Sequence, residues 1–269
     1  MYSQFMFDLE SAIAIQKHHY ASRSRPFFDY LGDRAHRGFT PTQFRIYRDN
    51  FFFRTFSTIP SISKVVIAAA FHEDFETLAD AGKNLADETG LGDPLKVHSR
   101  LLEDSHNAHA GRVFNLTGVR LSEAAGSLYL LPEAIRFKKV QASLYGSSQY
   151  AVVLAAAFAQ ETAADPMLKT FYEALFVPYR NCYSAAEFEV ISEYFVCHLD
   201  GTEQRHSDDA RRAVLRVCHD EADLHAAIEG MTAFWEAQSN LWNAMFEDFS
   251  RHESADELVP VTVPRPALP

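Results

Sequence analysis

The chain has 269 residues, 47% of them hydrophobic, and carries 36 acidic against 25 basic side chains, which gives a formal net charge of −11. A chain of this length buries a sizeable core without disulfides or metals to hold it. The acidic balance argues against nucleic acid or an anionic membrane as a partner, because both require a basic surface. Three cysteines without a Cys-x-x-Cys pair argue against a disulfide framework and a thiolate zinc site, and indicate a reducing compartment.

The first part of the chain predicts helices that are rich in aromatic residues. Apolar residues recur at near-helical spacing over 3–20, and Thr40 followed by Pro41 has the composition of a helix N-terminus. A further helical pattern covers 43–70, where Pro60 either kinks one long helix or separates two. Such wide apolar surface predicts the interior of a helical bundle.

The later segments continue the helical pattern. An amphipathic helix over 73–89 is closed by Gly90, and Asp93 followed by Pro94 predicts the start of the next helix. Further helices are predicted at 121–147, 149–176, 184–199, 206–216 and 221–248.

The chain as a whole predicts one all-α domain. Glycine and proline are scarce, at eleven each, and no run of alternating residues indicates a strand. We expect a bundle of about seven to nine helices over residues 1–252, followed by a Pro-rich, mobile tail over 253–269. The sequence has no signal-peptide pattern and no apolar run of about 18 residues, so we expect a cytoplasmic protein.

Ionisable residues in phase with the apolar stripe of a helix are candidates for function, because a buried carboxylate or imidazole must be paired or metal-bound. In the amphipathic helix the stripe ends in Glu88, whereas the adjacent Asp87 points away. His98 lies between two leucines on the next helix. Glu161 follows an uninterrupted apolar run over 151–159, which predicts a central helix. Each of these residues alone also fits a satisfied core position or a helix end.

A fourth group of candidates follows the alanine-rich helix further along the chain. His198 ends an apolar stripe, and a continuous helix would place Glu203 and His206 about one residue out of phase with it. A π-bulge or local break near Asp200 and Gly201 would bring all three together. A Glu-x-x-His pair on a bundle helix is a recurring set of iron ligands. Three imidazoles and three carboxylates favour iron or manganese over structural zinc.

These residues resemble a known ligand pattern. Glu88 and His98, ten positions apart, are similar to the third core helix region of the haem-oxygenase-like diiron oxidases and oxygenases, and the stretch from His198 to His206 resembles the ligand helix of that superfamily. The resemblance extends over about 3–245. It implies a haem-oxygenase-like bundle, about two Fe(II) per chain and O2 as co-substrate, with the ligands Glu88, His98, Glu161, His198, Glu203 and His206.

Two departures from the superfamily pattern matter. Its acidic ligand usually lies four residues after the first histidine of the ligand helix, where this chain has Thr202, so either Glu203 or Asp200 supplies the ligand. Members that oxygenate nitrogen use an extra glutamate on the preceding core helix, and the stretch 59–65 offers only serines and a lysine. The second departure argues against that subgroup.

The resemblance implies an oxidoreductase of specialised metabolism. Its substrate would be small and amino-acid-derived or a carboxylate, and the reaction N-oxygenation, C–C cleavage or oxidative rearrangement. Arg136 is a candidate clamp for a substrate carboxylate, although a surface salt bridge fits it equally well. The other candidate pocket residues, for which core packing is the alternative, are Phe52, Phe56, Tyr129, Tyr150 and Phe158.

Two other classes of function stay open. The same scaffold hosts metal-free enzymes, such as thiaminase-like hydrolases and a quinone-cofactor oxidase, in which His and Glu are acid–base groups; a non-catalytic helical binding protein is the other class. We discount Cys197 because it and His198 point about 100° apart on a helix. His106 and His109 are left out because they fall off the apolar stripe. The resemblance allows a homodimer, and we expect no nucleic-acid or membrane partner.

Overall fold

The computed structural model describes residues 2–254 and 257–261. These residues form α-helices joined by short 3-10 and π-helical segments, with no β-strand among them, which confirms the expected all-helical class. The α-helices are α1 (Tyr2–Arg34), α2 (Pro41–Thr55), α3 (Thr58–Phe71), α4 (Phe75–Glu88), α5 (His98–Phe114), α6 (Pro132–Tyr145), α7 (Tyr150–Phe171), α8 (Ala185–Leu199), α9 (Thr202–Val217) and α10 (Glu221–Arg251).

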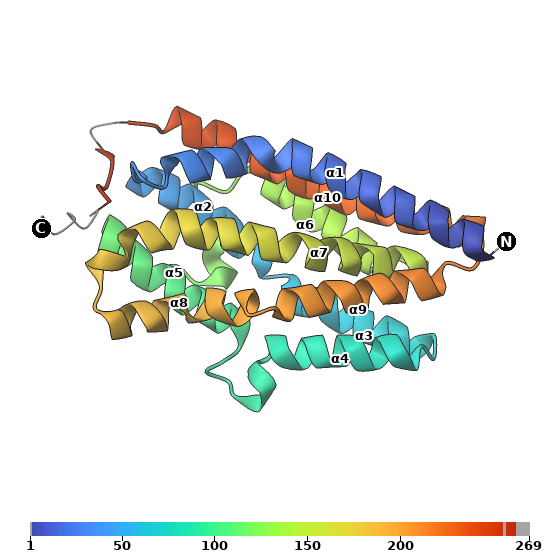
Figure 1. Ribbon diagram of the computed structural model, residues 1–269. Helices are drawn as coiled ribbons and strands as arrows, with labels where there is room; N and C mark the ends of the chain where they lie inside the picture. Colours follow the sequence, from blue (N-terminus) through green and yellow to red (C-terminus); the bar gives the residue numbers. More distant parts are fainter. Residues whose placement is uncertain (1, 255–256, 262–269) are drawn as a thin grey trace, which may run out of the picture.

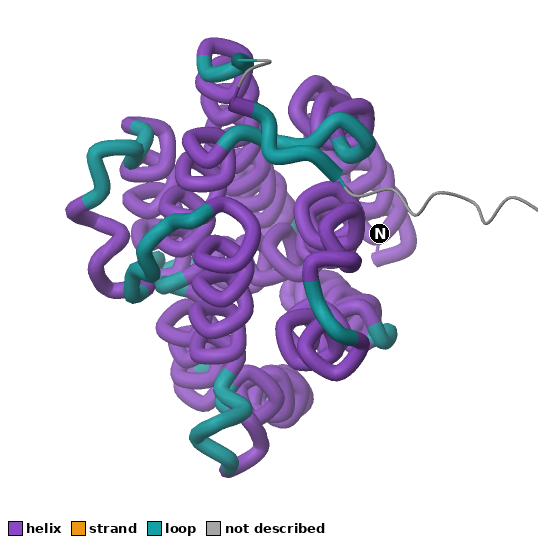
Figure 2. Tube along the Cα trace, turned by 90° about the vertical axis from the view of Figure 1, so that its left-hand side faces the viewer, coloured by secondary structure: helices purple, strands orange, loops and turns teal. Residues whose placement is uncertain are grey.

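Helix α7 lies at the centre of the bundle. It packs against α9 and α10 and also contacts α3, α6 and α8, while α1 runs along α10 (Figure 1). Figure 2 views many of the helices nearly end-on, as expected when their axes run in similar directions. The apolar run 151–159 is buried except for the half-buried Val152, because neighbours cover α7 on every side.

The aromatic stretch after Thr40 forms two helices. The Thr40 side chain and Gln43 form a reciprocal capping box at the start of α2. Pro60 lies in the first turn of α3, where a missing amide hydrogen costs little, so it separates two helices and does not kink one. Phe56 and Ser57, between the two helices, form the α2–α3 corner.

The connection between α4 and α5 corrects one expectation. Asp93 does not cap a helix, since its Oδ1 accepts a hydrogen bond from the backbone amide of Leu95 within a turn, and α5 begins only at His98. Gly90 has φ +77°, and a Cβ atom there would lie 2.7 Å from the carbonyl carbon of Lys96. The tight loop thus places the first residue of α5 beside the last residue of α4.

The α8–α9 junction is a local break of the predicted kind. Helix α8 ends at Leu199, Gly201 adopts φ +95°, and α9 restarts at Thr202. The left-handed residue resets the helical phase, so side chains on α9 no longer follow the stripe of α8.

Two histidines expected off the apolar stripe are fully buried. His106 lies 2.9 Å from the Tyr47 hydroxyl through Nε2, and His109 contacts the Tyr183 hydroxyl and the Leu175 carbonyl oxygen through its two ring nitrogens. Both imidazoles are satisfied within the aromatic core, so they need no metal or ligand.

The predicted tail begins with contacts to the bundle. Glu253 pairs with Arg34, and the backbone amide of Val259 donates to the Phe39 carbonyl oxygen at 3.0 Å. Residues 255–256 and 262–269 lie outside the described residues, and the mobility of the tail stays a prediction. In the part of the chain that the structure describes, no helix is long and apolar enough to cross a membrane.

Candidate metal centre

Six ionisable side chains from five helices converge in the interior. They come from α4, α5, α7, α8 and α9, and each residue is between 3% and 9% exposed. They are the six predicted ligands Glu88, His98, Glu161, His198, Glu203 and His206. Burial of so many ionisable groups requires pairing or a metal ion to offset their lost hydration.

Glu88 lies between two imidazoles. Its Oε2 is 3.4 Å from Nδ1 of His98, and its Oε1 is 3.7 Å from Nε2 of His198. Oε1 of Glu203 is 3.8 Å from the same Nε2 atom. Glu88, His198 and Glu203 thus offer ligand atoms that all lie within 4.8 Å of one another.

Glu161, Glu203 and His206 form a second group with ligand atoms within 4.8 Å of one another. Oε2 of Glu161 is 3.9 Å from Nδ1 of His206. Glu203 belongs to both groups, so its carboxylate lies where it can bridge two neighbouring ions, as carboxylates do in two-metal sites.

The break between α8 and α9 decides which acidic residue joins the cluster. Asp200 is exposed, and its Oδ1 accepts hydrogen bonds from the backbone amide and the hydroxyl of Thr202, at 3.0 and 2.6 Å. Asp200 therefore binds the first residue of α9 and stays outside the cluster. Glu203 and His206, one turn further along α9, point into the interior.

Each imidazole has one nitrogen held by a group outside the cluster. Nδ1–H of His198 donates to the Tyr194 carbonyl oxygen at 2.5 Å, and Nε2–H of His206 donates to Oδ2 of Asp87 at 3.3 Å. The remaining nitrogen of each ring faces the carboxylates. Fixing the outer nitrogen as a donor leaves the inner nitrogen with a free lone pair, which is the usual arrangement around metal-bound histidine.

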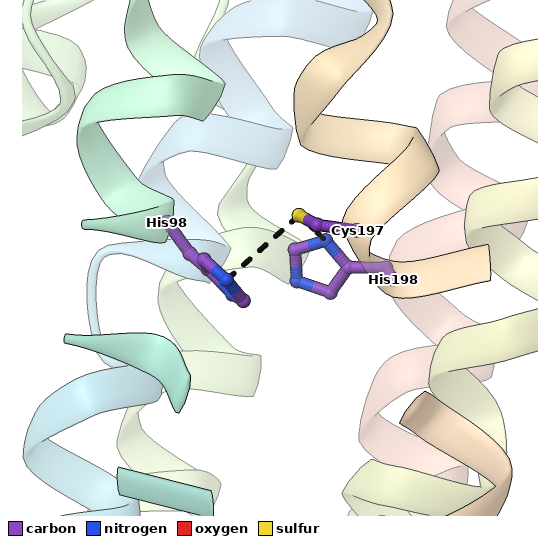
Figure 3. Close-up of side chains that lie close together, drawn as sticks. All are labelled: His98, Cys197 and His198. Carbon is purple, nitrogen blue, oxygen red and sulfur yellow. Dashed lines mark hydrogen bonds between the residues drawn. The ribbon is translucent and has the colours of Figure 1, made fainter. Parts of the chain in front are cut away.

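Two residues set aside on sequence grounds contact the cluster. Asp87 does not point away, because α9 brings His206 within reach of it. Cys197 Sγ lies 3.8 Å from Nε2 of His98 and 3.4 Å from Nδ1 of His198, and Figure 3 shows the thiol between the two rings. The 100° angle between adjacent helix positions does not keep a side chain away from a ring on a neighbouring helix. These three residues also form a third group able to hold a metal.

The inner nitrogens fit metal ions better than hydrogen bonds. Nδ1 of His98 and Nδ1 of His206 are buried and have no hydrogen-bond partner. The nitrogen–oxygen distances of 3.4 to 3.9 Å are too long for hydrogen bonds. When two ligand atoms are each ~2.1 Å from one ion and the ligand–metal–ligand angle is ~90–130°, they lie about 3.0–3.8 Å from each other. The observed distances are close to this range. A donor set of imidazole and carboxylate suits iron or manganese.

The electrostatics of the cluster show an excess of buried negative charge. Burial and the nearby Glu203 carboxylate raise the pKa of Glu161, and burial raises the pKa of Glu203 to about 7. Burial also opposes ionisation of Glu88, but the adjacent imidazoles of His198 and His98 hold its pKa well below the usual range. Despite burial, the contacts with Cys197 and Glu88 raise the pKa of His98 to about 9. Bound cations would supply the positive charge that these protons otherwise provide.

A cavity of about 240 Å³ opens onto the cluster. Its wall includes five of the six candidate ligands: Glu88, His98, Glu161, His198 and Glu203. The remaining wall comes mainly from the α2–α3 corner and from α7, and includes Arg54, Thr55, Phe56, Ile59, Met167 and Leu168.

Of the predicted pocket residues, only Phe56 lines this cavity. Phe52 and Phe158 are core residues, and Tyr150 stacks on His72 at the surface end of α7. Tyr129 lies under the guanidinium of Arg45 and is also outside the cavity.

The predicted clamp Arg136 is wrong in position. It is exposed and pairs with Glu133 one turn earlier on α6, so the surface salt bridge is the correct interpretation. Sequence reasoning missed Arg54, a buried arginine of the cavity wall. Its signal was a cation next to the Phe51–Phe53 run, inside a helix predicted to face the core.

No protein-family model and no curated protein matches the chain. Several solved structures match the chain in fold. A CADD-like protein of unknown function from Nostoc punctiforme superposes with a TM-score of 0.64 and 13% identity, over 94% of this chain and 97% of that one. A second structure described in the same words gives 0.66 and 14%, over 92% and 97%. A domain of unknown function with a heme oxygenase-like fold from Shewanella denitrificans gives 0.62 and 14%, over 93% and 95%. The chain therefore has the haem-oxygenase-like fold that its sequence resemblance implied.

Proposed function

We propose that this chain is an O2-dependent non-haem diiron oxidoreductase that oxidises a small amino-acid-derived or carboxylate substrate. The observation that carries the proposal is the orientation of the imidazoles, each held at its outer nitrogen and facing carboxylates with its inner one. The two buried Nδ1 atoms without partners, on His98 and His206, would be satisfied by metal ions. The haem-oxygenase-like fold supports the proposal, because the sequence resembles diiron members of that fold.

The residues divide into two ligand groups. Glu88, His98 and His198 would hold one iron, Glu161 and His206 the other, and Glu203 would lie between the two ions. The iron pair, when bound, supplies the electrons that activate dioxygen.

The surrounding residues prepare the site. The Tyr194 carbonyl oxygen and the Asp87 carboxylate fix the tautomers of His198 and His206. Met167 and Leu168 present apolar surface to the cavity beside the ligands, which keeps bulk water from the reacting groups.

Anaerobic loading with Fe(II) tests the proposal. Protein freed of excess iron is assayed for bound metal and then for oxygen uptake on mixing with air-saturated buffer. We expect about two irons per chain and rapid oxygen uptake. Replacing Glu161 or His206 by alanine should abolish the uptake, because each removes a ligand. His225→Ala, at an exposed position on α10, is the matched control and should behave like the native protein.

A metal-free acid–base enzyme of the same fold is the second candidate. One observation favours it: although burial works against the thiolate, hydrogen bonds from His198 and His98 lower the pKa of Cys197 to about 7. Glu203 lines the cavity and Cys197 lies behind its His98 and His198, so the site has groups able to exchange protons near neutral pH. Failure to bind iron, together with an activity that survives chelators, would refute the diiron proposal and favour this one.

A further inference from the structure

Arg54 is a buried cation in the wall of the cavity that also exposes the metal-ligand cluster. The residue is 5% exposed and lies in the last turn of α2. Its Nη2 donates to Oε1 of Gln238 at 2.9 Å, and its guanidinium carbon is 5.6 Å from the centre of the Phe137 ring. Gln238 is itself held by the Tyr20 hydroxyl, so a buried network fixes the orientation of the guanidinium.

No carboxylate lies within ion-pair distance of this guanidinium in the described part of the chain, although the Glu161 carboxylate of the same cavity acts on it electrostatically at longer range. Of the five N–H donors of Arg54, only the one to Gln238 has an acceptor there, with Nε buried and unpartnered. Burial lowers the pKa of Arg54, but a guanidinium remains charged at any physiological pH. A buried cation without a direct ion pair is costly, and an anion that binds beside it recovers part of this cost.

Thr55, next to Arg54, also has a buried polar atom without a hydrogen-bond partner. The atom is Oγ1, and Thr55 lines the same cavity as Arg54. Two consecutive residues therefore offer unused donors at one place in the wall. A carboxylate can accept from both a guanidinium and a hydroxyl, in a charge-assisted arrangement.

The charge balance of a loaded site also favours an anion. Two divalent ions are balanced by the carboxylates of Glu88, Glu161, Glu203 and the adjacent Asp87, so Arg54 leaves the loaded site with one positive charge. The cavity volume of about 240 Å³ equals that of about eight water molecules at ~30 Å³ each, which suits a ligand of amino-acid size. Phe56, Ile59 and Met167 supply apolar surface for its carbon skeleton.

We propose that Arg54, with Thr55, binds the carboxylate of an anionic substrate and so presents the carbon skeleton of that substrate to the metal-ligand cluster. The proposal deepens the proposed function and rests on it for the reaction, but not for the binding. It replaces Arg136, whose side chain is exposed and already paired with Glu133.

The experiment compares matched carboxylates and amides by calorimetry. Hexanoate and hexanamide, and 3-phenylpropanoate and its amide, are titrated into the metal-free protein and into Fe(II)-loaded protein under argon. In at least one form, the native protein should bind each carboxylate at least about tenfold more tightly than the amide. Arg54→Met should abolish this preference, Arg54→Lys should retain part of it, and the exposed control Arg136→Gln should leave it unchanged.

A purely structural role for Arg54 predicts a different result. Loss of the Gln238 and Phe137 contacts would lower the thermal midpoint of Arg54→Met without changing the ratio of carboxylate to amide affinity. An unchanged ratio in a folded Arg54 variant, or no preference in either form of the native protein, would overturn the proposal. Arg54→Lys keeps the charge and serves as the variant if Arg54→Met does not fold. Iron content is measured separately, so native protein that prefers carboxylates but binds no iron would refute the diiron function alone.

Discussion

Asp87 accepts a hydrogen bond from Nε2–H of His206 at 3.3 Å, and this contact turns Nδ1 of the same ring toward Glu161. The aspartate belongs to α4 and the histidine to α9, two helices that pack against each other. A side chain outside the cluster thus fixes both the tautomer and the direction of a candidate ligand.

Replacing Asp87 by asparagine should weaken iron binding by about 10- to 100-fold, the usual cost of losing a carboxylate behind a metal-bound histidine. The fold should be kept, since Asp87 is partly exposed. Competition with a chromophoric chelator measures the affinity. Asp104→Asn, at an exposed residue of α5, is the control, and equal affinities of the two variants would contradict a supporting role for Asp87.

Substitutions of Glu203 and Asp200 should have opposite effects on the amount of bound iron. Glu203→Gln should reduce bound iron from about two ions per chain to about one or none, because its carboxylate belongs to both ligand groups. Asp200→Asn should keep both ions and only weaken the hydrogen bonds to Thr202 at the start of α9. Metal analysis of the two purified variants decides between them, and iron loss in Asp200→Asn alone would reverse the assignment.

Cys197 should act on His98 from outside the metal centre. Cobalt(II) bound in place of iron should therefore show no thiolate-to-cobalt charge-transfer band, and Cys197→Ser should bind cobalt within a few-fold of the native affinity. Absorption spectra of both proteins are the measurement. A charge-transfer band that disappears in Cys197→Ser would place the metal instead in the group formed by His98, Cys197 and His198.

His109 should make the metal-free protein sensitive to acid. Burial lowers the pKa of His109 to about 3, whereas an unfolded histidine titrates near 6.5. Below pH ~6.5 the unfolded chain binds a proton that the folded chain does not, so His109 removes about 1.4 kcal/mol of the free energy of unfolding per pH unit between ~6.5 and ~3. Above that range it has no effect.

The free energy of unfolding of metal-free native protein and of His109→Gln, measured by urea titration from pH 7 down to pH 4.5, tests this expectation. The variant should be less stable at pH 7, because it loses contacts with Tyr183 and Leu175, but its stability should fall less steeply with acid. Parallel curves for the two proteins would show that His109 titrates normally in the fold.

The helical class and the candidate ligands could be predicted because they depend on local pattern. Apolar periodicity placed Glu88, Glu161 and His198 on inward faces, and the chemistry of Gly201 indicated a break that could bring Glu203 into line. These features follow from 3.6 residues per turn and from the positive φ that glycine permits.

What could not be predicted depends on contacts between helices far apart in the sequence. Asp87 lies off the apolar stripe of its own helix and is recruited by His206 from α9. Arg54 lies beside phenylalanines in the sequence, which predicts only a core helix. That it borders a cavity depends on how the α2–α3 corner packs against the ligand helices. Arg136 was wrong because its neighbour Glu133 satisfies it locally, a pairing that sequence spacing allows but does not impose.

In the proposed diiron centre, the three imidazoles and three carboxylates would hold two irons with Glu203 between them. Anomalous diffraction at the iron edge, from crystals of anaerobically Fe(II)-loaded protein, tests it most directly. The account predicts two iron peaks, one beside His98, Glu88 and His198 and one beside Glu161 and His206, with Glu203 between them. A single peak beside Cys197, or no peak in protein shown to be folded, would contradict it.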